Sequence, residues 1–525
     1  MSDVPVFQNG SALPRRDLLR FSAFAGAAFV IAPSAADAAR SVFRHGVASG
    51  DPLPDRVMLW TRVTPTSDAV PGSGRGPSVT VGYEVAEDAV FKRVVRRGSA
   101  TTGPAHDHTV KVDATGLRAG RTYFYRFTFD GHRSPVGRTK TAPTGSVSQL
   151  RFGVVSCSNY QAGHFAAYQH LAERGDLDAV VHLGDYLYEY GPGEYGAFRA
   201  HQPAREVTTL AEYRMRHGQY KTDPQLQQLH AAYPWIITWD DHETANDAWS
   251  GGAENHTEGA EGTWVSRRAA ALRAYHEWMP IRFGAGDTIY RRLRFGSLAS
   301  LSMLDLRSYR AKQGTPGSLT GPDQMAFLRE SLLDSDVQWK LVGNPVMFSP
   351  LLVPPLPLAV GTALASLTGQ SPDGVVLNND QWDGYSADRR ALISLLADNG
   401  VRDTVFLTGD IHTSWAFEVP VDAGTYPLSR TVATELVVPS VTSDNIDDLT
   451  RTPPRTSSVA VETALMGLNR HLKWAELDSH GYAVLDVRPA EVRMSWYFLA
   501  DRQRADSPAA LAKSVVVPAG TQSIR

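Results

Sequence analysis

The sequence predicts an α/β sandwich domain that is preceded by an all-β domain, and two observations carry this prediction. Residues 41 to about 145 read as short strands with alternating apolar and polar residues, a pattern typical of half-buried strands. From Leu150 onward, strand segments alternate with helical segments and a few strands follow one another directly, which favours an α/β sandwich. A chain of 525 residues is long enough for two domains, one of them large.

The N-terminal domain, residues 41–145, is expected to be a β-sandwich. Residues 123–127 follow a turn with a Tyr-x-Tyr-x-Phe pattern, which resembles the late strands of a fibronectin-III or immunoglobulin-like sandwich. The polar stretch 140–148 contains one Pro and one Gly and predicts the domain boundary. Further strands are expected at residues 57–63, 79–85 and 109–112.

The second domain, residues 150–525, is expected to contain the alternating elements. Apolar runs predict strands at residues 150–155, 178–181, 235–239, 300–304, 339–342, 404–407, 434–438, 481–487 and 492–498. Helical segments are expected at residues 164–174, 208–230 and 263–278. Residues 350–367 are rich in Pro, Leu, Val and Ala and are interpreted as a buried or rim loop, with a lipid-facing lip as the alternative.

The N-terminus has the features of an export signal. A twin arginine, Arg15-Arg16, precedes the apolar residues 21–30, and Ala36-Asp37-Ala38 supplies a cleavage pattern. Residues 1–38 therefore resemble a Tat signal peptide, which predicts recognition by the Tat export machinery and a periplasmic or extracellular location. A membrane anchor is the alternative, but the apolar run is short and a small-residue cleavage site follows it.

Composition excludes several classes of protein. The formal net charge of −3 gives no basic field for nucleic acid. The single cysteine, Cys157, rules out an intrachain disulfide. No internal run is long and apolar enough to span a membrane, so no stable membrane anchor is expected. With 42% hydrophobic residues, the chain can bury a large core without covalent cross-links.

Potential metal ligands follow four of the predicted strands. Each has a structural alternative, because Asp after a strand often caps a helix, and Cys and His are often buried core residues. Together, at the carboxyl ends of strands where α/β sheets bind ligands, they predict one site. Clustered carboxylates repel one another unless a cation neutralises them. The residues are Cys157, then Asp185 and Tyr188 after Gly184, then Asp240, Asp241, His242 and Asn246, and finally Asp410 and His412.

These motifs resemble a known enzyme family. Gly-Asp-x-x-Tyr at 184–188, Asp-His-Glu at 241–243 and Gly-Asp-x-His at 409–412 are similar to the calcineurin-like metallophosphoesterase signature. Cys157, Asp241 and Asp410 depart from the broad signature but agree with its PhoD-type alkaline phosphatase/phosphodiesterase subgroup. The strings at 45–52, 156–157, 182–186, 239–243, 381–385 and 407–412 resemble the same subgroup. The resemblance covers nearly the whole chain and implies a metallophosphoesterase-like four-layer α/β sandwich.

The ligand types predict two unlike metals. Thiolate, phenolate and carboxylate suit a trivalent ion, so Cys157, Asp185 and Tyr188, with His412, are expected to hold Fe³⁺. The oxygen ligands of Asp185, Asp241, Asn246 and Asp410 suit a hard divalent ion, which the resemblance implies is Ca²⁺. Asp185 would bridge the two ions. Whether Asp240 or Asp241 ligates stays open, because Asp240 could instead support a ligand.

Two ions about 3.5–4 Å apart can hold a phosphate ester and a hydroxide together, which predicts in-line attack at phosphorus. His242 is the candidate for protonating the leaving alkoxide or stabilising the transition state. Arg267 and Arg268 could bind phosphate oxygens, or form a solvated helix face.

The predicted activity is hydrolysis of phosphate monoesters and diesters at alkaline pH. An alternative within the enzymes is a phospholipase D-like phosphodiesterase, which the apolar residues 350–367 would suit. An alternative from another class is a cell-surface binding protein that has lost its active site.

Overall fold

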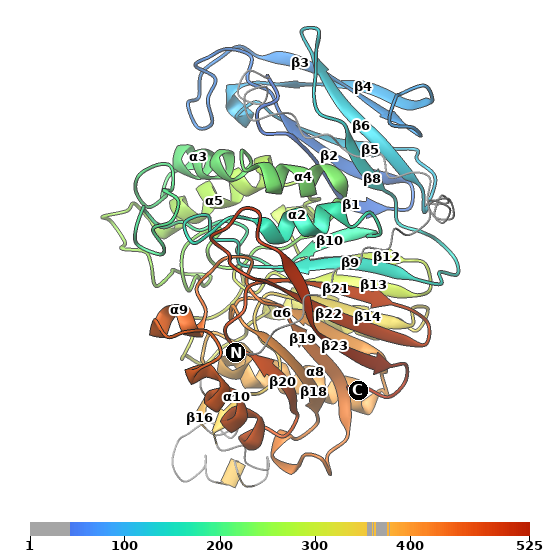
Figure 1. Cartoon of the computed structure of the whole chain (residues 1–525), viewed down its shortest axis with the longest axis vertical. Coiled ribbons are helices and arrows are strands. Elements are labelled where there is room, and N and C mark those ends of the chain that lie inside the picture. Colours follow the sequence, from blue (N-terminus) through green and yellow to red (C-terminus); the bar gives the residue numbers. More distant parts are fainter. Residues whose placement is uncertain (1–41, 354–359, 361, 364–374, 377) are drawn as a thin grey trace, which may run out of the picture.

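The computed structural model describes residues 42–353, 360, 362–363, 375–376 and 378–525. Its main body consists of two large sheets that pack face to face, with helices on their outer faces (Figure 1). The predicted signal peptide, residues 1–38, lies outside the described residues. The same holds for most of the apolar segment 350–367, of which 354–359, 361 and 364–367 are not described.

A nine-stranded sheet forms one central layer. Its strands pair in the order β23 (Ala509–Pro518), β22 (Glu491–Leu499), β21 (Gly481–Val487), β9 (Leu150–Val155), β10 (Ala179–His182), β11 (Pro234–Ile237), β1 (Val47–Leu53), β2 (Arg56–Arg62) and β5 (Thr109–Thr115). The strands β9, β10 and β11 are parallel to one another. They are short apolar runs that are buried on both faces, as parallel strands usually are.

A seven-stranded sheet forms the second central layer. Its order is β12 (Arg291–Phe295), β13 (Ala299–Met303), β14 (Trp339–Asn344), β17 (Thr404–Thr408), β19 (Thr431–Val437), β18 (Ser414–Pro420) and β20 (Leu472–Glu476). Side chains from both sheets share one buried cluster, in which Phe152 and Val181 pack with Leu301 and Leu341. This apolar interface fixes the two sheets against each other.

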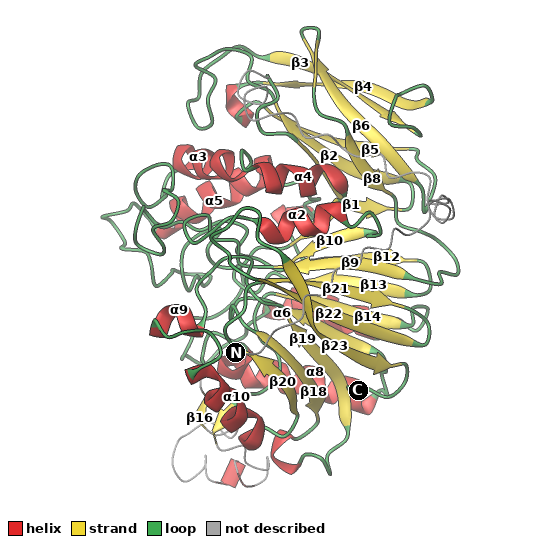
Figure 2. Cartoon of the chain, viewed as in Figure 1, coloured by secondary structure: helices red, strands yellow, loops and turns green. Residues whose placement is uncertain are grey.

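Helices cover the two outer faces (Figure 2). The face of β9–β11 is packed by α2 (Ala166–Glu173), α3 (Leu210–Tyr220), α4 (Pro224–Ala232) and α5 (Trp264–Trp278), and the seven-stranded sheet by α6 (Gly321–Leu332) and α8 (Ser386–Asp398). Two further helices are α9 (Ile446–Thr450) and α10 (Ser457–Leu468). Helix, sheet, sheet and helix make the four-layer α/β sandwich that the resemblance implied.

The predicted helical region 208–230 divides into two helices. The Asp223 side chain accepts hydrogen bonds from the backbone of Gln225 and Leu226, and Pro224 occupies the first position of α4. Asp at the N-cap and Pro at the first helical position are both helix-start signals, which explains the break. The helices expected at 164–174 and 263–278 are present as α2 and α5.

The N-terminal β-sandwich is present, but it shares a sheet with the rest of the chain. Strand β1 pairs in parallel with β11, so β1, β2 and β5 extend the nine-stranded sheet. The facing sheet consists of β4 (Val94–Thr102), β3 (Val79–Ala86), β6 (Thr122–Phe129), β7 (His132–Arg133) and β8 (Gly137–Lys140). Val57 and Leu59 pack with Val81 and Tyr125 between the two layers. A domain boundary between residues 145 and 150 therefore stays a prediction, because the hydrogen-bonded sheet crosses it.

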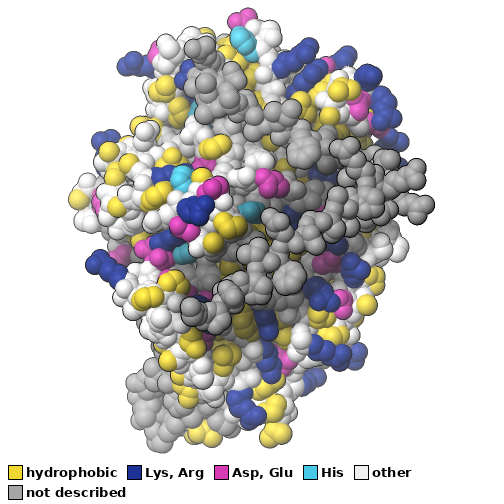
Figure 3. All heavy atoms as spheres, in the orientation of Figure 1, with side chains coloured by type: hydrophobic (Ala, Val, Ile, Leu, Met, Phe, Trp, Pro, Cys, Tyr) yellow, Lys and Arg dark blue, Asp and Glu magenta, His cyan; other side chains and the backbone are white. Residues whose placement is uncertain are grey.

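The surface carries mixed charge. On the face shown in Figure 3, Lys and Arg side chains are spread over the molecule with acidic side chains between them. This distribution agrees with the near-neutral formal charge of −3. Within the described part of the chain, no helix is both long and apolar enough to cross a membrane.

Candidate metal centre

The predicted ligands gather where strands of both large sheets end. Cys157 follows β9, Asp185 follows β10 and Asp240 follows β11, each by two or three residues. Asp410 lies two residues after β17 of the facing sheet. The carboxyl ends of these parallel strands lie on one side of the molecule, where loops crowd together at the left of Figure 2. The structure thus brings together residues that are up to 255 positions apart in the sequence.

Four of the candidate ligands have a left-handed backbone. The φ angle is +58° at Cys157, +55° at Asp185, +66° at Asp410 and +60° at His412. Residues other than glycine seldom adopt this conformation, and it clusters at functional sites because it directs a side chain that an ordinary turn would not. The repeated conformation indicates that the loops are shaped around the positions of these side chains.

Close packing fixes the turn at Asp185. Gly184 has φ +108°, and a Cβ atom at this position would lie only 2.6 Å from the Cβ of Asp240. The buried carboxylate of Glu243 accepts hydrogen bonds from the backbone of Asp185 and Tyr186 at 3.1 and 2.7 Å, and from Asp240 at 2.9 Å. The Glu243 carboxylate therefore links the loop after β10 to the loop after β11.

One group of ligand atoms combines sulfur, oxygen and nitrogen. Ligand atoms of Cys157, Asp185 and His412 lie within 4.8 Å of one another. The Tyr188 hydroxyl donates to Asp185 Oδ2 at 3.1 Å and lies 3.4 Å from His412 Nε2. His412 Nδ1 donates to the carbonyl of Asp444 at 2.7 Å, which turns Nε2 toward the group.

The thiol of Cys157 is unfavourably placed for ionisation in the protein alone. Burial, followed by the charge of Asp185, raises the pKa of Cys157 well above its usual value. A bound cation reverses this balance, because metal coordination deprotonates a thiol outright. The site therefore fits a metal with an affinity for sulfur.

A second group consists of carboxylates. Ligand oxygens of Asp185, Asp240, Asp241 and Asp410 lie within 4.8 Å of one another, and Asp185 belongs to both groups. Asp185 Oδ1 and Asp240 Oδ2 are buried without a hydrogen-bond partner in the described structure. Burial, followed by the charge of Asp380, raises the pKa of Asp410 to about 7. Buried, unpaired carboxylate oxygens at this spacing fit a hard cation, with Asp185 as the shared ligand.

His242 lies beside both groups and is held by a buried acid. Its Nδ1 donates to Glu189 Oε2 at 2.8 Å, and its ring packs 4.1 Å from the ring of Tyr188. Burial disfavours the charged imidazole, but the carboxylates of Glu189, Asp241 and Asp185 outweigh it and raise the pKa of His242 well above its ordinary value. The hydrogen bond to Glu189 thus fixes the orientation of the imidazole next to the cluster and favours its protonated form.

Arg307 is a residue of the centre that the sequence reasoning missed. Its guanidinium donates to Asp240 and forms two parallel hydrogen bonds of 2.8 Å with Asp380. It also lies 3.5 Å from Asp410, and Arg310 contacts Asp380 at 2.6 Å. Two signals could have found it: Arg307 lies four residues after β13, and Asp380 directly precedes the motif at 381–385.

The two arginines predicted to bind phosphate have partners within the protein. Arg267 is buried and forms ion pairs with Glu206 and Glu261, so its charge is already neutralised. Arg268 donates to the carbonyl of Ser308 at 3.2 Å. We therefore do not assign a phosphate clamp to either arginine.

Asn246 borders the centre. It lines a cavity of about 550 Å³ together with Asp185, Asp241, His242 and His412. Its side-chain amide donates to Glu254 at 3.0 Å, which leaves the amide oxygen as the candidate ligand atom. The cavity gives the cluster room for a substrate.

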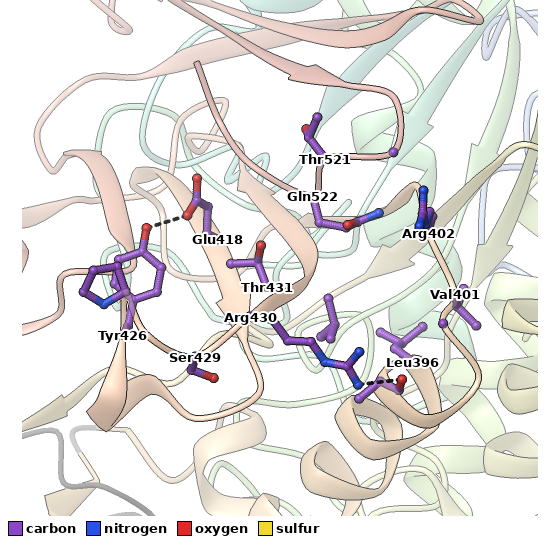
Figure 4. Close-up of a pocket in the computed structure, with 15 residues that line it drawn as sticks. Leu396, Val401, Arg402, Glu418, Tyr426, Ser429, Arg430, Thr431, Thr521 and Gln522 are labelled. Carbon is purple, nitrogen blue, oxygen red and sulfur yellow. Dashed lines mark hydrogen bonds between the residues drawn. The ribbon is translucent and has the colours of Figure 1, made fainter.

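A cavity of about 480 Å³ lies at the opposite edge of the seven-stranded sheet (Figure 4). It is lined by Arg402 and Thr431, which stand at the start of the parallel strands β17 and β19, and by the C-terminal segment at Thr521. Ligands of α/β sheets bind at the other, carboxyl ends of the strands. The side chains of this second cavity include none of the predicted site residues.

Comparison with known proteins identifies the family. A model of the PhoD-like phosphatase family matches residues 152–496, and a model of its N-terminal domain matches residues 30–143. The chain belongs to the PhoD-like phosphatase family. It is 39% identical to alkaline phosphatase D of Bacillus subtilis over 427 residues, which cover 76% of this chain and 69% of the relative. A solved structure of PhoD superposes with a TM-score of 0.81 at 34% identity, covering 92% of this chain and 91% of that one.

Family membership confirms the resemblance that the motifs predicted, and the structural likeness confirms the fold class. The protein is a phosphoric ester hydrolase of the PhoD type. Family and side-chain cluster together indicate a metal cofactor.

Proposed function

We propose that this PhoD-like phosphatase is an exported alkaline phosphatase and phosphodiesterase with a mixed Fe³⁺ and Ca²⁺ centre. The observation that carries the proposal is the position of the chain's single thiol. Cys157 lies within one group with Asp185 and His412, and the Tyr188 phenol contacts the latter two. Three anionic donors of different type and one imidazole form the kind of set that balances a trivalent ion.

The proposed divalent site uses oxygen donors only. Asp185, Asp241, Asn246 and Asp410 are its ligands, in keeping with the preference of Ca²⁺ for carboxylate and amide oxygens. Asp240 joins them, because Arg307 occupies one of its oxygens while Oδ2 has no hydrogen bond in the described structure. The Asp241 oxygens each accept one backbone N–H, from His242 and Asp247, which still leaves lone pairs for a metal.

The chain's own residues position and protonate the substrate. When bound, the two ions would neutralise phosphate charge and lower the pKa of water for in-line attack at phosphorus. His242, held in its charged form by Glu189, donates its Nε2 proton to the leaving alkoxide. Arg307 restrains Asp240 and Asp410 through charge, so that the acidic cluster keeps its geometry.

Export by the Tat route is part of the proposal. It rests on the twin arginine Arg15-Arg16, the apolar residues 21–30 and the cleavage pattern at 36–38. Replacement of both arginines by lysine should retain the full-length precursor in the cytoplasm, as measured by cell fractionation. Unchanged export would contradict the Tat assignment.

Elemental analysis of the exported protein tests the metal assignment. We expect iron and calcium in the purified protein and a visible charge-transfer band from the thiolate and phenolate ligands. Cys157→Ala should lose iron and colour while its circular dichroism stays unchanged. Ser158→Ala is the control in the same loop: it removes a hydroxyl that donates to the carbonyl of Tyr186 but no candidate ligand atom, and it should keep the iron. Zinc alone, or full iron in Cys157→Ala, would overturn the proposed centre.

A further inference from the structure

A second, apolar cavity adjoins the candidate metal centre. It measures about 240 Å³ and is bordered by apolar side chains from separate segments, among them Met347, Trp415, Leu465 and Leu477. Met347, Trp415 and Leu477 belong to one buried cluster against which Leu465 packs. The walls are therefore built by the fold rather than by one loose loop.

The apolar cavity and the cavity of the metal centre share part of their walls. Asn378, Ile411 and Ile446 line both spaces. Ile411 stands between the proposed ligands Asp410 and His412, so the apolar space begins directly beside the metal positions. The apolar space is therefore adjacent to the place where a phosphate ester would bind.

Two polar side chains of the wall, Gln381 and Asp383, are already engaged within the protein. The Gln381 amide donates to Asp410 and accepts from the backbone of Met347. Asp383 accepts from Arg389 and from the backbone of Leu351. Because a polar substituent would lose its water without gaining a partner, the space favours an apolar one.

The volume fits a group of definite size. An apolar cavity of about 150 Å³ is large enough to hold benzene. The space here is larger, at about 240 Å³. It therefore accommodates an aryl ring or a medium-length alkyl chain.

We infer that this space is a specificity subsite for an apolar alkyl or aryl group of the phosphate ester. The inference rests on the proposed function, because it requires the phosphate to bind at the metal cluster. Preferred substrates are then amphiphilic esters, with the charged phosphate at the metals and the apolar substituent beside Ile411 and Trp415.

Helix α10 supplies a matched pair of positions at the rim. Val461 lines the apolar space and has 45% of its surface exposed. Val459 is 40% exposed on the same helix but is not part of the lining. Substitution of either residue by glutamine adds the same polar group to the same helix, and the partial exposure of both positions allows the fold to tolerate it.

The test is binding of n-alkylphosphonates, from methyl to octyl, to the metal-loaded enzyme by titration calorimetry. We expect the dissociation constant to fall about fourfold for each added methylene until the space is filled. A dissociation constant that does not change with chain length would overturn the subsite.

Two variants of helix α10 test whether the dependence on chain length arises in this cavity. Val461→Gln should flatten the dependence on chain length, whereas Val459→Gln should keep the wild-type slope. Equal slopes in both variants would overturn the assignment of this cavity. Hydrolysis of methyl 4-nitrophenyl phosphate is measured separately: its absence would count against the proposed function, while the binding series still decides on the subsite.

Discussion

The two edges of the seven-stranded sheet carry cavities of similar size and different character. At the carboxyl edge, a cavity of about 550 Å³ is lined by carboxylates and by the imidazoles of His242 and His412. At the opposite edge, the cavity of about 480 Å³ is bordered by Arg402 and Arg430, both exposed. Its buried acid, Glu418, accepts hydrogen bonds from Tyr426 and from the backbone of Ile524.

Volume does not distinguish the two edges, but the number and chemistry of the unpaired groups and of the residues with positive φ do. The carboxyl edge holds Asp185 and Asp240 oxygens without partners and four candidate ligand residues with positive φ. The lining of the opposite cavity includes one non-glycine residue with positive φ, Gln522, whose amide nitrogen is buried without a partner in the described structure. Such features cost free energy in the protein alone and persist where binding compensates for them. Pairs of substitutions, one at each edge, therefore test whether these features are needed for activity.

Asp185→Asn should have the largest effect on activity. It weakens both metal sites at once, because Asp185 belongs to both ligand groups. We expect kcat/KM to fall by about 10³- to 10⁴-fold, the loss of several kcal/mol of charge stabilisation. The metal-free variant should unfold at the same denaturant concentration as metal-free wild type or higher, since one repelling carboxylate is gone. Arg402→Ala at the opposite edge should leave kcat/KM within about twofold, the range expected for an exposed site. If Asp185→Asn kept the kcat/KM of the wild type, the carboxylates of the carboxyl edge would not be needed for activity, and the proposed difference between the two edges would be wrong.

A glycine pair separates backbone strain from crowding. Gly184 and Gly400 both have positive φ, but only at Gly184 would an added Cβ meet neighbouring atoms, with Asp240 at 2.6 Å. Gly400→Ala should cost about 1–2 kcal/mol of unfolding free energy from strain alone. Gly184→Ala should cost about 1–3 kcal/mol more from overpacking, and it should lower metal content because Asp185 shifts. Equal losses in urea titrations of the two variants would contradict the crowding argument.

Glu189→Gln should produce an intermediate effect on turnover. The variant keeps an acceptor for the backbone of Asn246 but removes the charge that holds His242 protonated. We expect kcat to fall by about 10- to 100-fold with metal content unchanged. The loss should be greater for alkyl esters than for nitrophenyl esters, because only the poor leaving group needs the proton. An equal loss for both classes of ester would mean that His242 does not act as the acid.

Much of the fold could be predicted because local signals and tertiary structure agree. The apolar runs at 178–181, 235–239 and 404–407 became β10, β11 and β17, since strands buried on both faces need such runs. Strand β1 was not predicted as a strand, because its sequence VASGDPL lacks that signal. It exists through pairing with β11, about 185 residues away, which no local pattern reveals.

The clustering of the candidate ligands was predictable for the same reason, because they come from the segments that follow recognisable strands. Arg307 was not, because its role depends on Asp380, 73 residues further along the chain. For Arg267 the sequence did not reveal the partners that the residue has in the folded protein. Its position early in a helix suggested phosphate binding, but Glu206 and Glu261 neutralise it in the folded protein. Pairing of charges across loops is set by packing, so the sequence alone cannot assign it.

Arg430→Ala should give the smallest effect and defines the limit of the comparison. Arg430 donates to the carbonyl of Ala397 near the C-terminal end of α8 at 2.6 Å (Figure 4). Loss of this bond should lower the unfolding free energy by about 1 kcal/mol. Since the cavity stands at the start of β17 and β19, whereas the metal cluster follows the end of β17, kcat/KM and metal content should not change. If Arg430→Ala lost activity but kept its metal content and its unfolding free energy, the two edges would be energetically coupled. The cavity at the start of β17 and β19 would then contribute to catalysis.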